Sequence, residues 1–343
     1  MALTTKSLKT AVAASLAATM VAGLMAPASA EISKRTIRVS NGVAEDHPVG
    51  EGVRAMAQCF DEKTGGEWTL NAFWSSALGD DLQATQALRS GTQEMVITSS
   101  SPIVGILPAL GVFDLPFLFA NEAEADAVLD GEFGQYVSDM LPAANLVNLA
   151  YWENGFRNLT NSVRPVNNLE DFSGMRVRVM QNNIFLDTFQ TLGTNATPMA
   201  FGEVFSALET GAIDAQENPY VTIDTSKFFE VQKYLSNTRH AYTPFMVLFS
   251  KPIWDQYSEE EHQILIDCAV IGRDVQREAS RKLSEESLDR ITEAGLAVND
   301  IDTAEMEQIR EAVQGVYERH ADQIGPEVVE RMQAALAEIR GQQ

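Results

Sequence analysis

Residues 36–74 read TIRVSNGVAEDHPVGEGVRAMAQCFDEKTGGEWTLNAFW, and this segment sets the expected fold class. Thr36–Asn41 alternates apolar and polar residues as a half-buried strand does, and Trp68–Trp74 is predicted to be the next strand. Between them, Pro48 stands where the first turn of a helix tolerates proline, and apolar residues recur at helical spacing over Val49–Phe60. The segment therefore predicts a strand, a helix and a second strand.

The same alternation continues beyond this segment. A helix is expected over Asp80–Arg89 and a third strand over Met95–Thr98, which together indicate a largely parallel sheet covered by helices. Phe113–Phe119 is apolar but interrupted by Pro116, and we expect a buried loop there. The pattern then restarts, with strands at Leu146–Tyr151, Phe156–Thr160, Met175–Met180 and Phe245–Phe249, and helices at Asn182–Leu192, Phe201–Leu208, Ser258–Ala294, Thr303–His320 and Pro326–Ile339. Two α/β units and one long, charged helix predict an α/β protein of two lobes bridged by that helix.

The first thirty residues are predicted to be a cleavable signal peptide. Lys6 and Lys9 precede an apolar run over Ala11–Met25, and the small residues Ala28–Ala30 supply a cleavage site before Glu31. The alternative is a membrane anchor, but the apolar run is shorter than the roughly 20 residues that a spanning helix needs. We therefore expect the mature chain in the periplasm of a Gram-negative bacterium, or at least outside the cytoplasm.

The chain is strongly acidic, and this excludes nucleic acid as a partner. It has 25 Lys and Arg against 48 Asp and Glu, so its net charge is −23, and loss of Lys6 and Lys9 with the leader makes it −25. Phosphate binding needs a basic surface. An anionic ligand would have to be bound by local cations in a cleft. Solubility or a salty habitat accounts for the acidity at least as well as a role in docking.

The two cysteines, Cys59 and Cys268, have two readings. In an oxidising compartment they can form a disulfide, yet each lies in an apolar helical pattern and can equally be a buried small hydrophobic residue. Their separation in space does not follow from the sequence.

Motifs of enzymes and metal sites are missing from the sequence. None of the four histidines, His47, His240, His262 and His320, is paired at the spacing that puts two zinc ligands on one helical face. There is no Gly-x-Ser-x-Gly elbow and no Walker loop. Gly50–Ala55 imitates a dinucleotide fingerprint but lies inside a predicted helix. We therefore expect no catalytic residue, no metal site and no required cofactor.

Three polar residues form a constellation that predicts a carboxylate receptor. Arg178 lies on an alternating strand, with Val177 and Val179 on the opposite face; Arg157 follows a Gly-Phe pair, and Asn218 lies in a turn segment before a proline. A guanidinium pairs two N–H groups with two carboxylate oxygens, and an arginine within a sheet layer needs an anion to offset its burial. Ligands of open α/β sheets bind at the ends of strands, where we expect these residues to meet. For each arginine alone, the alternative is a surface ion pair.

The chain resembles the periplasmic solute-binding proteins of TRAP (tripartite ATP-independent periplasmic) transporters, of the C4-dicarboxylate and sugar-acid type, from Thr36 to about His320. The segments that carry the resemblance are Leu78–Asp81, Phe113–Phe117, Gly155–Asn161, Gly174–Val179, Thr197–Phe201, Gln216–Pro219 and Lys227–Lys233.

The resemblance implies a role for each of four residues. Arg178 makes a paired salt bridge to the substrate carboxylate, Asn218 helps to hold the same group, Arg157 supplies a second cation, and Phe201 is a packing wall. It also implies a hinged cleft between two domains, one of residues 31–155 plus about 244–283 and the other of 156–243 plus about 284–320, with a C-terminal helix at 321–343 packing on the lobes. The protein is expected to be a monomer that delivers its ligand to small and large integral membrane subunits for ion-coupled uptake.

The ligand is expected to be a sugar acid. Where sialic-acid-binding relatives carry a glutamate and an arginine, this chain has Ser99–Pro102, which argues against sialate. The remaining candidates for the distal part of the site are mostly neutral hydrogen-bonding groups: His47, Gln83, Arg89, Ser99, Gln181 and Asn154, with Asn182 beside them. A hexuronate such as D-glucuronate or D-galacturonate ranks first.

Three alternatives stay open. A C4-dicarboxylate such as malate or succinate ranks second, with Arg157 or Arg89 clamping its distal carboxylate. A secreted enzyme acting on a carboxylated substrate is the rival from another class, and it would depend on a titratable residue such as His47 or Asp81. A receptor that only senses its ligand would share the same site.

Overall fold

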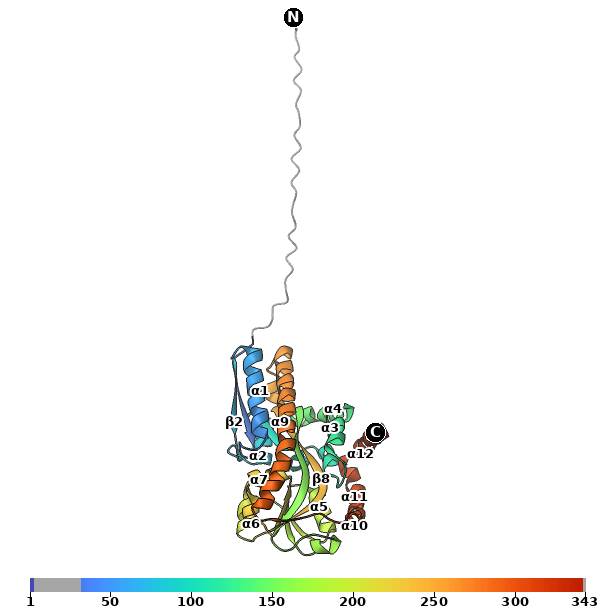
Figure 1. The fold of residues 1–343 in the computed structure, drawn as a ribbon. Helices are drawn as coiled ribbons and strands as arrows, with labels where there is room; N and C mark the ends of the chain where they lie inside the picture. The colour runs from blue at the N-terminus through green and yellow to red at the C-terminus, as the bar shows by residue number, and fades with distance from the viewer. Residues whose placement is uncertain (3–31, 342–343) are drawn as a thin grey trace. The chain divides into compact units, whose positions relative to one another are not determined.

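The computed structural model describes residues 1–2 and 32–341, so the predicted signal peptide lies almost wholly outside the described residues. Within them, the backbone forms one mixed sheet covered by helices (Figure 1). The strands are β1 (Arg35–Asn41), β2 (Trp68–Phe73), β3 (Met95–Ser99), β4 (Leu146–Asn161), β5 (Arg176–Val179), β6 (Asn195–Pro198), β7 (Ala215–Asn218), β8 (Tyr234–Ser250) and β9 (Ala297–Asn299).

The nine described strands follow the order β2-β1-β3-β8-β4-β7-β5-β6, with β9 beside β8. The outer pairs are parallel: β1 with β2 and β3, β5 with β6 and β7, and β9 with β8. The two long central strands, β4 and β8, pair antiparallel with each other along most of their length. β8 also pairs antiparallel with β3, and β4 pairs antiparallel with β7. Two parallel α/β units therefore meet across one antiparallel pair, which confirms the α/β expectation.

The helices cover this sheet and extend beyond it. They are α1 (Val49–Thr64), α2 (Asp81–Arg89), α3 (Glu122–Leu129), α4 (Glu132–Ser138), α5 (Asn183–Thr191), α6 (Val204–Glu209), α7 (Tyr220–Thr225), α8 (Lys251–Trp254), α9 (Glu259–Glu293), α10 (Thr303–Val313), α11 (Gly315–Ile324) and α12 (Pro326–Gly341), with short 3-10 turns that include η1 (Ser101–Ile103), η2 (Pro108–Asp114) and η5 (Phe201–Glu203). Among the described residues, no helix combines the length and apolarity needed to cross a bilayer.

Local sequence signals explain where the main helices begin. Asp80 caps α2 and Ser258 caps α9, and each forms a capping box with a residue three positions on, Gln83 and Glu261 respectively. The capping amide of Asn182 accepts hydrogen bonds from the first turn of α5. The carboxylates Glu259–Glu261 that follow Ser258 thus lie in the first turn of α9, where negative charge is favourable.

Helix α9 spans 35 residues and contacts α1 near its start and α7 further along (Figure 1). Where α1 and α9 pass over the fully buried Trp152 of β4, both have glycine. A Cβ added to Gly52 or Gly272 would lie 2.5 Å or 2.6 Å from the indole ring. The indole N–H also donates to the Ala269 carbonyl at 3.0 Å. These two glycines allow the close approach of both helices to the sheet.

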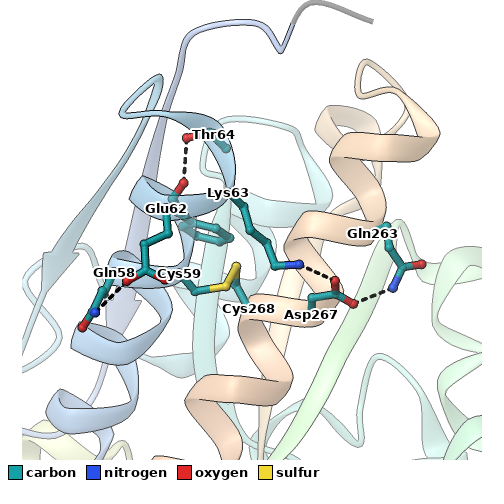
Figure 2. Close-up of a disulfide and its surroundings, with 9 residues drawn as sticks. Gln58, Cys59, Glu62, Lys63, Thr64, Gln263, Asp267 and Cys268 are labelled. Carbon is teal, nitrogen blue, oxygen red and sulfur yellow. Dashed lines mark hydrogen bonds and ion pairs between the residues drawn. A yellow bond between two sulfur atoms is a disulfide. The ribbon is translucent and has the colours of Figure 1, made fainter. Parts of the chain in front are cut away.

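A disulfide joins Cys59 of α1 to Cys268 of α9 (Figure 2). This answers the question that the sequence left open, and it links residues 209 positions apart. Lys63 and Asp267, one turn or less away on the same helices, form a partly exposed ion pair at 2.8 Å.

Several elements differ from the expectation for identifiable reasons. The strands expected at Leu146–Tyr151 and Phe156–Thr160 are one strand, β4, because Gly155 adopts a φ of 113° in an irregularity of the β4–β8 register and does not end the strand. The segment before Pro219 is strand β7 and not a turn. The segment expected as a loop from Phe113 onwards begins within the 3-10 turn η2. The division into two domains at the stated residues stays a prediction.

Candidate functional site

A cavity lies where the ends of the parallel strands approach the central pair β4 and β8. Its lining is formed by Asn41, Gly42, Val43, Asp81, Ser99, Asn154, Arg157, Arg178, Met180, Phe201, Asn218, Thr222 and Phe245. Six of these residues were predicted for the binding site: Arg178, Arg157, Asn218, Phe201, Ser99 and Asn154. The structure therefore brings them together around one space.

Arg178 lies on β5 and is 2% exposed. Its Nε and Nη2 both donate to the Met199 carbonyl oxygen, at 2.9 Å and 2.6 Å. Its Nη1 is buried and has no hydrogen-bond partner among the described residues, and no carboxylate of those residues forms a salt bridge with this side chain. Burial lowers the pKa of Arg178 to about 10, with Glu217 opposing that shift and the charge of Arg157 adding to it. The guanidinium therefore stays charged at neutral pH without an ion-pair partner among the described residues.

Arg157 is in a different state, although it lines the same cavity. Its Nε and Nη2 donate to the two carboxylate oxygens of Glu217 at 2.5 Å and 3.0 Å, and both side chains are fully buried. The imidazole of His240 lies 3.0 Å from the same carboxylate. Burial alone would raise the pKa of Glu217, but the Arg157 charge and the hydrogen bonds from His240 and Arg157 lower it to about 2. The charge of Arg157 is thus already balanced within the protein.

This pairing corrects one part of the sequence reasoning. Arg157 was expected near a strand end, but it lies in the interior of β4, opposite Ala241 of β8. Its fork is occupied by Glu217 because β7, which carries Glu217, pairs with β4 at this level. Direct contact of Arg157 with a ligand carboxylate stays a prediction.

Asn218 ends β7 and connects Arg157 to the rest of the site. Its Oδ1 accepts from Arg157 Nη2 at 3.0 Å, and its Nδ2 donates to Gln216 Oε1 at 2.6 Å. Phe201 begins the turn η5 and contacts Phe228 edge to face, with ring centroids 6.0 Å apart. Asn218 therefore contributes a polar group to the cavity lining, and Phe201 contributes an apolar wall.

Ser99 and Asn154 add neutral polar groups. Ser99 ends β3, and its hydroxyl lies 3.5 Å from that of Ser101. The amide of Asn154 on β4 donates to Thr243 Oγ1 at 3.1 Å, whereas its Oδ1 is buried and has no partner among the described residues. These groups suit hydroxyl recognition, because a buried donor or acceptor needs a partner.

Four predicted site residues lie outside the lining. Arg89 ends α2 and donates to the Ala144 carbonyl and to Gln86. Gln83 is exposed in the capping box of α2, and Gln181 is half-buried between β5 and α5. His47 is 1% exposed and lies behind the lining residues Thr222 and Phe245. Asn182, named beside them, caps α5 and donates to Asp114 and the Ser101 carbonyl.

Sequence reasoning missed three polar residues of the lining: Asn41, Asp81 and Thr222. Asn41 ends β1, so the rule that ligands meet strand ends was a usable signal for it. Asp81 accepts from the Thr98 hydroxyl at 2.9 Å, and burial raises the pKa of its carboxyl, partly offset by that hydrogen bond. From the sequence, Asp81 was named only as a titratable residue of the rival enzyme and not for the binding site. Thr222 follows the Asn-Pro segment on α7, and nothing in its local pattern distinguishes it.

The chemistry of this arrangement is recognition of an anion. A permanent cation whose Nη1 has no partner among the described residues shares a cavity with neutral hydrogen-bonding side chains, an aromatic wall and the carboxyl group of Asp81, at the strand ends of an α/β sheet. A carboxylate would satisfy the free side of Arg178, and the neutral groups would take up hydroxyls.

Comparison with known proteins gives consistent matches. The family model DctP, described as bacterial extracellular solute-binding protein, family 7, matches residues 39–323. The sugar acid binding protein DctPAm from Advenella mimigardefordensis strain DPN7T, solved in complex with galactonate, is 44% identical, with a TM-score of 0.88 over 90% of this chain and 99% of that chain.

Two further matches also cover most of the chain. A TRAP periplasmic solute binding protein from Sulfitobacter sp. NAS-14.1, solved with bound β-D-galacturonate, is 34% identical, with a TM-score of 0.83 over 87% of this chain and 98% of that chain. The 2,3-diketo-L-gulonate-binding periplasmic protein YiaO of Escherichia coli strain K12 is 35% identical over 281 residues, which are 82% of this chain and 86% of that protein.

Proposed function

The chain belongs to the bacterial extracellular solute-binding proteins of family 7, and from this membership we propose that it captures a sugar acid in the periplasm for a TRAP transporter. Proteins of this family are solute receptors and not enzymes, and their fold is the two-lobed fold of periplasmic binding proteins. Delivery to integral membrane subunits, ion-coupled uptake and a monomeric state in solution are parts of the same proposal.

The observation that carries the proposal is the state of Arg178. A guanidinium that is 2% exposed, without an ion pair among the described residues and with Nη1 unpartnered, is costly unless an anion binds to it. A single ligand carboxylate satisfies this guanidinium. Arg178 lines the cavity next to neutral polar groups. This is the site of a monocarboxylate.

A hydroxylated monocarboxylate is favoured over a C4-dicarboxylate. Neither cation proposed to bind a second carboxylate is free to do so in the cavity. Arg157 already pairs with Glu217, and Arg89 lies outside the lining and binds the Ala144 carbonyl. Neutral groups such as Ser99, Asn154 and Thr222 remain for the rest of the ligand. Solved relatives carry galactonate and β-D-galacturonate, which supports hexuronates and adds the open-chain hexonates to the candidates.

Mass spectrometry of the small molecule that co-purifies with the chain tests this proposal most directly. It should be followed by a thermal-shift panel of D-galacturonate, D-glucuronate, D-galactonate, succinate and malate. A ligand at 100 times its Kd stabilises the folded state by about 2.7 kcal/mol through mass action, so the bound acid should raise Tm by several degrees. A response to succinate or malate without any response to the sugar acids would overturn the ligand assignment and leave the receptor role in place.

A further inference from the structure

The side chain of Thr222 lines the cavity and is contacted from behind by a buried histidine. Thr222 lies in the first turn of α7, and its Oγ1 is 3.4 Å from Nε2 of His47. His47 precedes α1 and is 1% exposed, with its ring edge to face against Phe245, another lining residue, at 5.9 Å. The pair therefore connects the loop before α1 with the wall of the cavity.

The contacts of His47 determine which ring nitrogen carries the proton. The backbone N–H of Val49 donates to Nδ1 at 3.3 Å, so Nδ1 is an acceptor and carries no hydrogen. Burial lowers the pKa of His47 to about 3, so the imidazole is neutral at physiological pH. A neutral ring whose Nδ1 accepts must carry its proton on Nε2, which faces Thr222.

The direction of the second hydrogen bond follows from this tautomer. His47 Nε2–H donates, so Thr222 Oγ1 accepts, and the hydroxyl hydrogen of Thr222 has to find another acceptor. Within residues 32–341, His47 is the one hydrogen-bond partner of the Thr222 hydroxyl, and in this tautomer it accepts nothing from it. Buried donors are nearly always hydrogen-bonded. The partner of the Thr222 hydroxyl hydrogen is therefore expected in the cavity that this residue lines.

We propose that Thr222 donates a hydrogen bond to a hydroxyl oxygen of the bound sugar acid, and that His47 is the positioning residue that fixes the direction of this bond. The inference rests on the proposed binding of a sugar acid. Arg178 takes the carboxylate, so Thr222 selects among acids by a hydroxyl group. A site built to bond a hydroxyl discriminates against the analogue that lacks it, because its own polar group is then left unpaired.

The tautomer is tested without a ligand. In the ¹⁵N-labelled full chain, the long-range nitrogen–proton NMR correlations of the His47 ring should show a pyridine-like Nδ1 and a protonated Nε2, unchanged between pH 5 and 8. His47→Phe identifies the signals. A protonated Nδ1 or a cationic ring in this range would overturn the inference, whether or not a sugar acid binds.

The role of Thr222 is tested by calorimetry with the sugar acid that responds in the thermal-shift panel. Thr222→Val should weaken binding about tenfold, which is the loss expected for one hydrogen bond in a buried site. Thr222→Ser keeps the hydroxyl and should stay within about twofold of the wild type. His47→Gln keeps an N–H donor towards Thr222 and should bind more tightly than His47→Phe. A Thr222→Val protein with unchanged affinity would refute the contact and leave the receptor function intact.

Monodeoxy derivatives of the same acid complete the test. Removal of the one sugar hydroxyl that bonds to Thr222 should weaken binding to the wild type about tenfold. The same removal should change binding to Thr222→Val by less than about twofold, because this variant already lacks the threonine hydroxyl. Equal losses for every derivative in both proteins would show that Thr222 contacts no ligand hydroxyl. If the wild type binds no sugar acid at all, both this inference and the proposed function fail.

Discussion

At the scale of single residues, the two cavity arginines show how burial and pairing separate two chemically identical side chains. Arg157 shares a bidentate salt bridge with Glu217 and belongs to the frame of the protein. Among the described residues, Arg178 is bonded only to the Met199 backbone carbonyl, and its Nη1 amino group has no partner. Neutralising a buried guanidinium requires a carboxylate in both cases. One arginine finds it within the chain, and the other finds it in the proposed ligand.

We expect Arg178→Ala to weaken binding of the sugar acid by roughly 2–5 kcal/mol, because the substitution leaves the ligand carboxylate desolvated and unpaired. Arg176→Ala is the matched control two residues away on the same strand. Arg176 is exposed and pairs with Asp214, and its loss should change affinity by less than about 0.5 kcal/mol. Isothermal titration calorimetry measures both, and similar affinity in the two variants would contradict the assignment of Arg178.

His47 should make the stability of the folded state sensitive to acid. Burial lowers its pKa from 6.5 to about 3 in the folded state, so the unfolded chain takes up a proton below pH 6.5 that the folded chain does not bind. The free energy of unfolding then falls by up to about 1.4 kcal/mol per pH unit as the pH decreases from 6.5 towards 3. Asp114, whose pKa burial raises to about 7, acts in the opposite direction, so His47 has to be isolated by comparison.

The comparison is between the wild type and His47→Gln in urea unfolding at pH 7.5 and pH 5. The difference in stability between the two proteins should shift in favour of the variant by roughly 2 kcal/mol at the lower pH. A difference that stays constant with pH would mean that His47 accepts a proton in the folded state as easily as in the unfolded chain.

At the scale of elements, helix α9 is held to α1 by a covalent bond and by close packing over Trp152. The disulfide closes a loop of 209 residues, and such a long closed loop restricts the unfolded chain strongly. Neither cysteine lines the cavity, so the bond acts on the scaffold and not on the ligand.

Replacing both cysteines, Cys59→Ala with Cys268→Ala, should reduce the free energy of unfolding by roughly 2–5 kcal/mol. The affinity for the ligand should change by no more than a few-fold. Lys63→Ala is the local control, since it breaks only the partly exposed pair with Asp267 beside the disulfide and should cost less than about 1 kcal/mol (Figure 2). Guanidinium unfolding provides the measurement, and equal losses in the two variants would show that the disulfide contributes no more than a surface ion pair.

At the scale of the whole molecule, an acidic protein binds an anion. The chain has a net charge of −23, and −25 without the predicted leader, so it repels an anionic ligand at long range, while Arg178 attracts it only at short range. Raising the ionic strength from 0.01 M to 0.15 M shortens the Debye length from about 30 Å to about 8 Å and screens the repulsion.

The association rate constant should therefore increase a few-fold over this range, and the dissociation rate constant should change little. Stopped-flow tryptophan fluorescence can follow both. A decrease of the association rate with salt would show that the local field of the cavity arginines already dominates at the distance from which the ligand approaches.

How far the sequence could predict this molecule depends on the range of each interaction. Arg178 could be predicted as a site residue because strand alternation and the chemistry of arginine are both local properties of the sequence. The salt bridge between Arg157 and Glu217 joins residues 60 positions apart, and nothing near either residue reveals it. The same holds for the disulfide and for the contact of His47 with Thr222. Gly155 was misleading because a glycine with positive φ ends many strands but here only bends β4.

The family and the α/β class were predicted correctly, since many ordered segments carry the resemblance and periodicity reports on secondary structure. Domain boundaries and ligand contacts stay predictions. Domain boundaries depend on which contacts form within each lobe and which form between the lobes. Ligand contacts depend on side-chain directions that no local pattern encodes.

The position of β8 also has a consequence for biosynthesis. This strand is hydrogen-bonded to both β3 and β4, yet it begins at Tyr234, so more than two thirds of the polypeptide leaves the ribosome before it. Until then β3 and β4 expose unpaired backbone edges, which are templates for mispairing. A nascent chain that cannot complete its sheet until late in translation would remain threadable through a secretion channel, which the proposed periplasmic role requires.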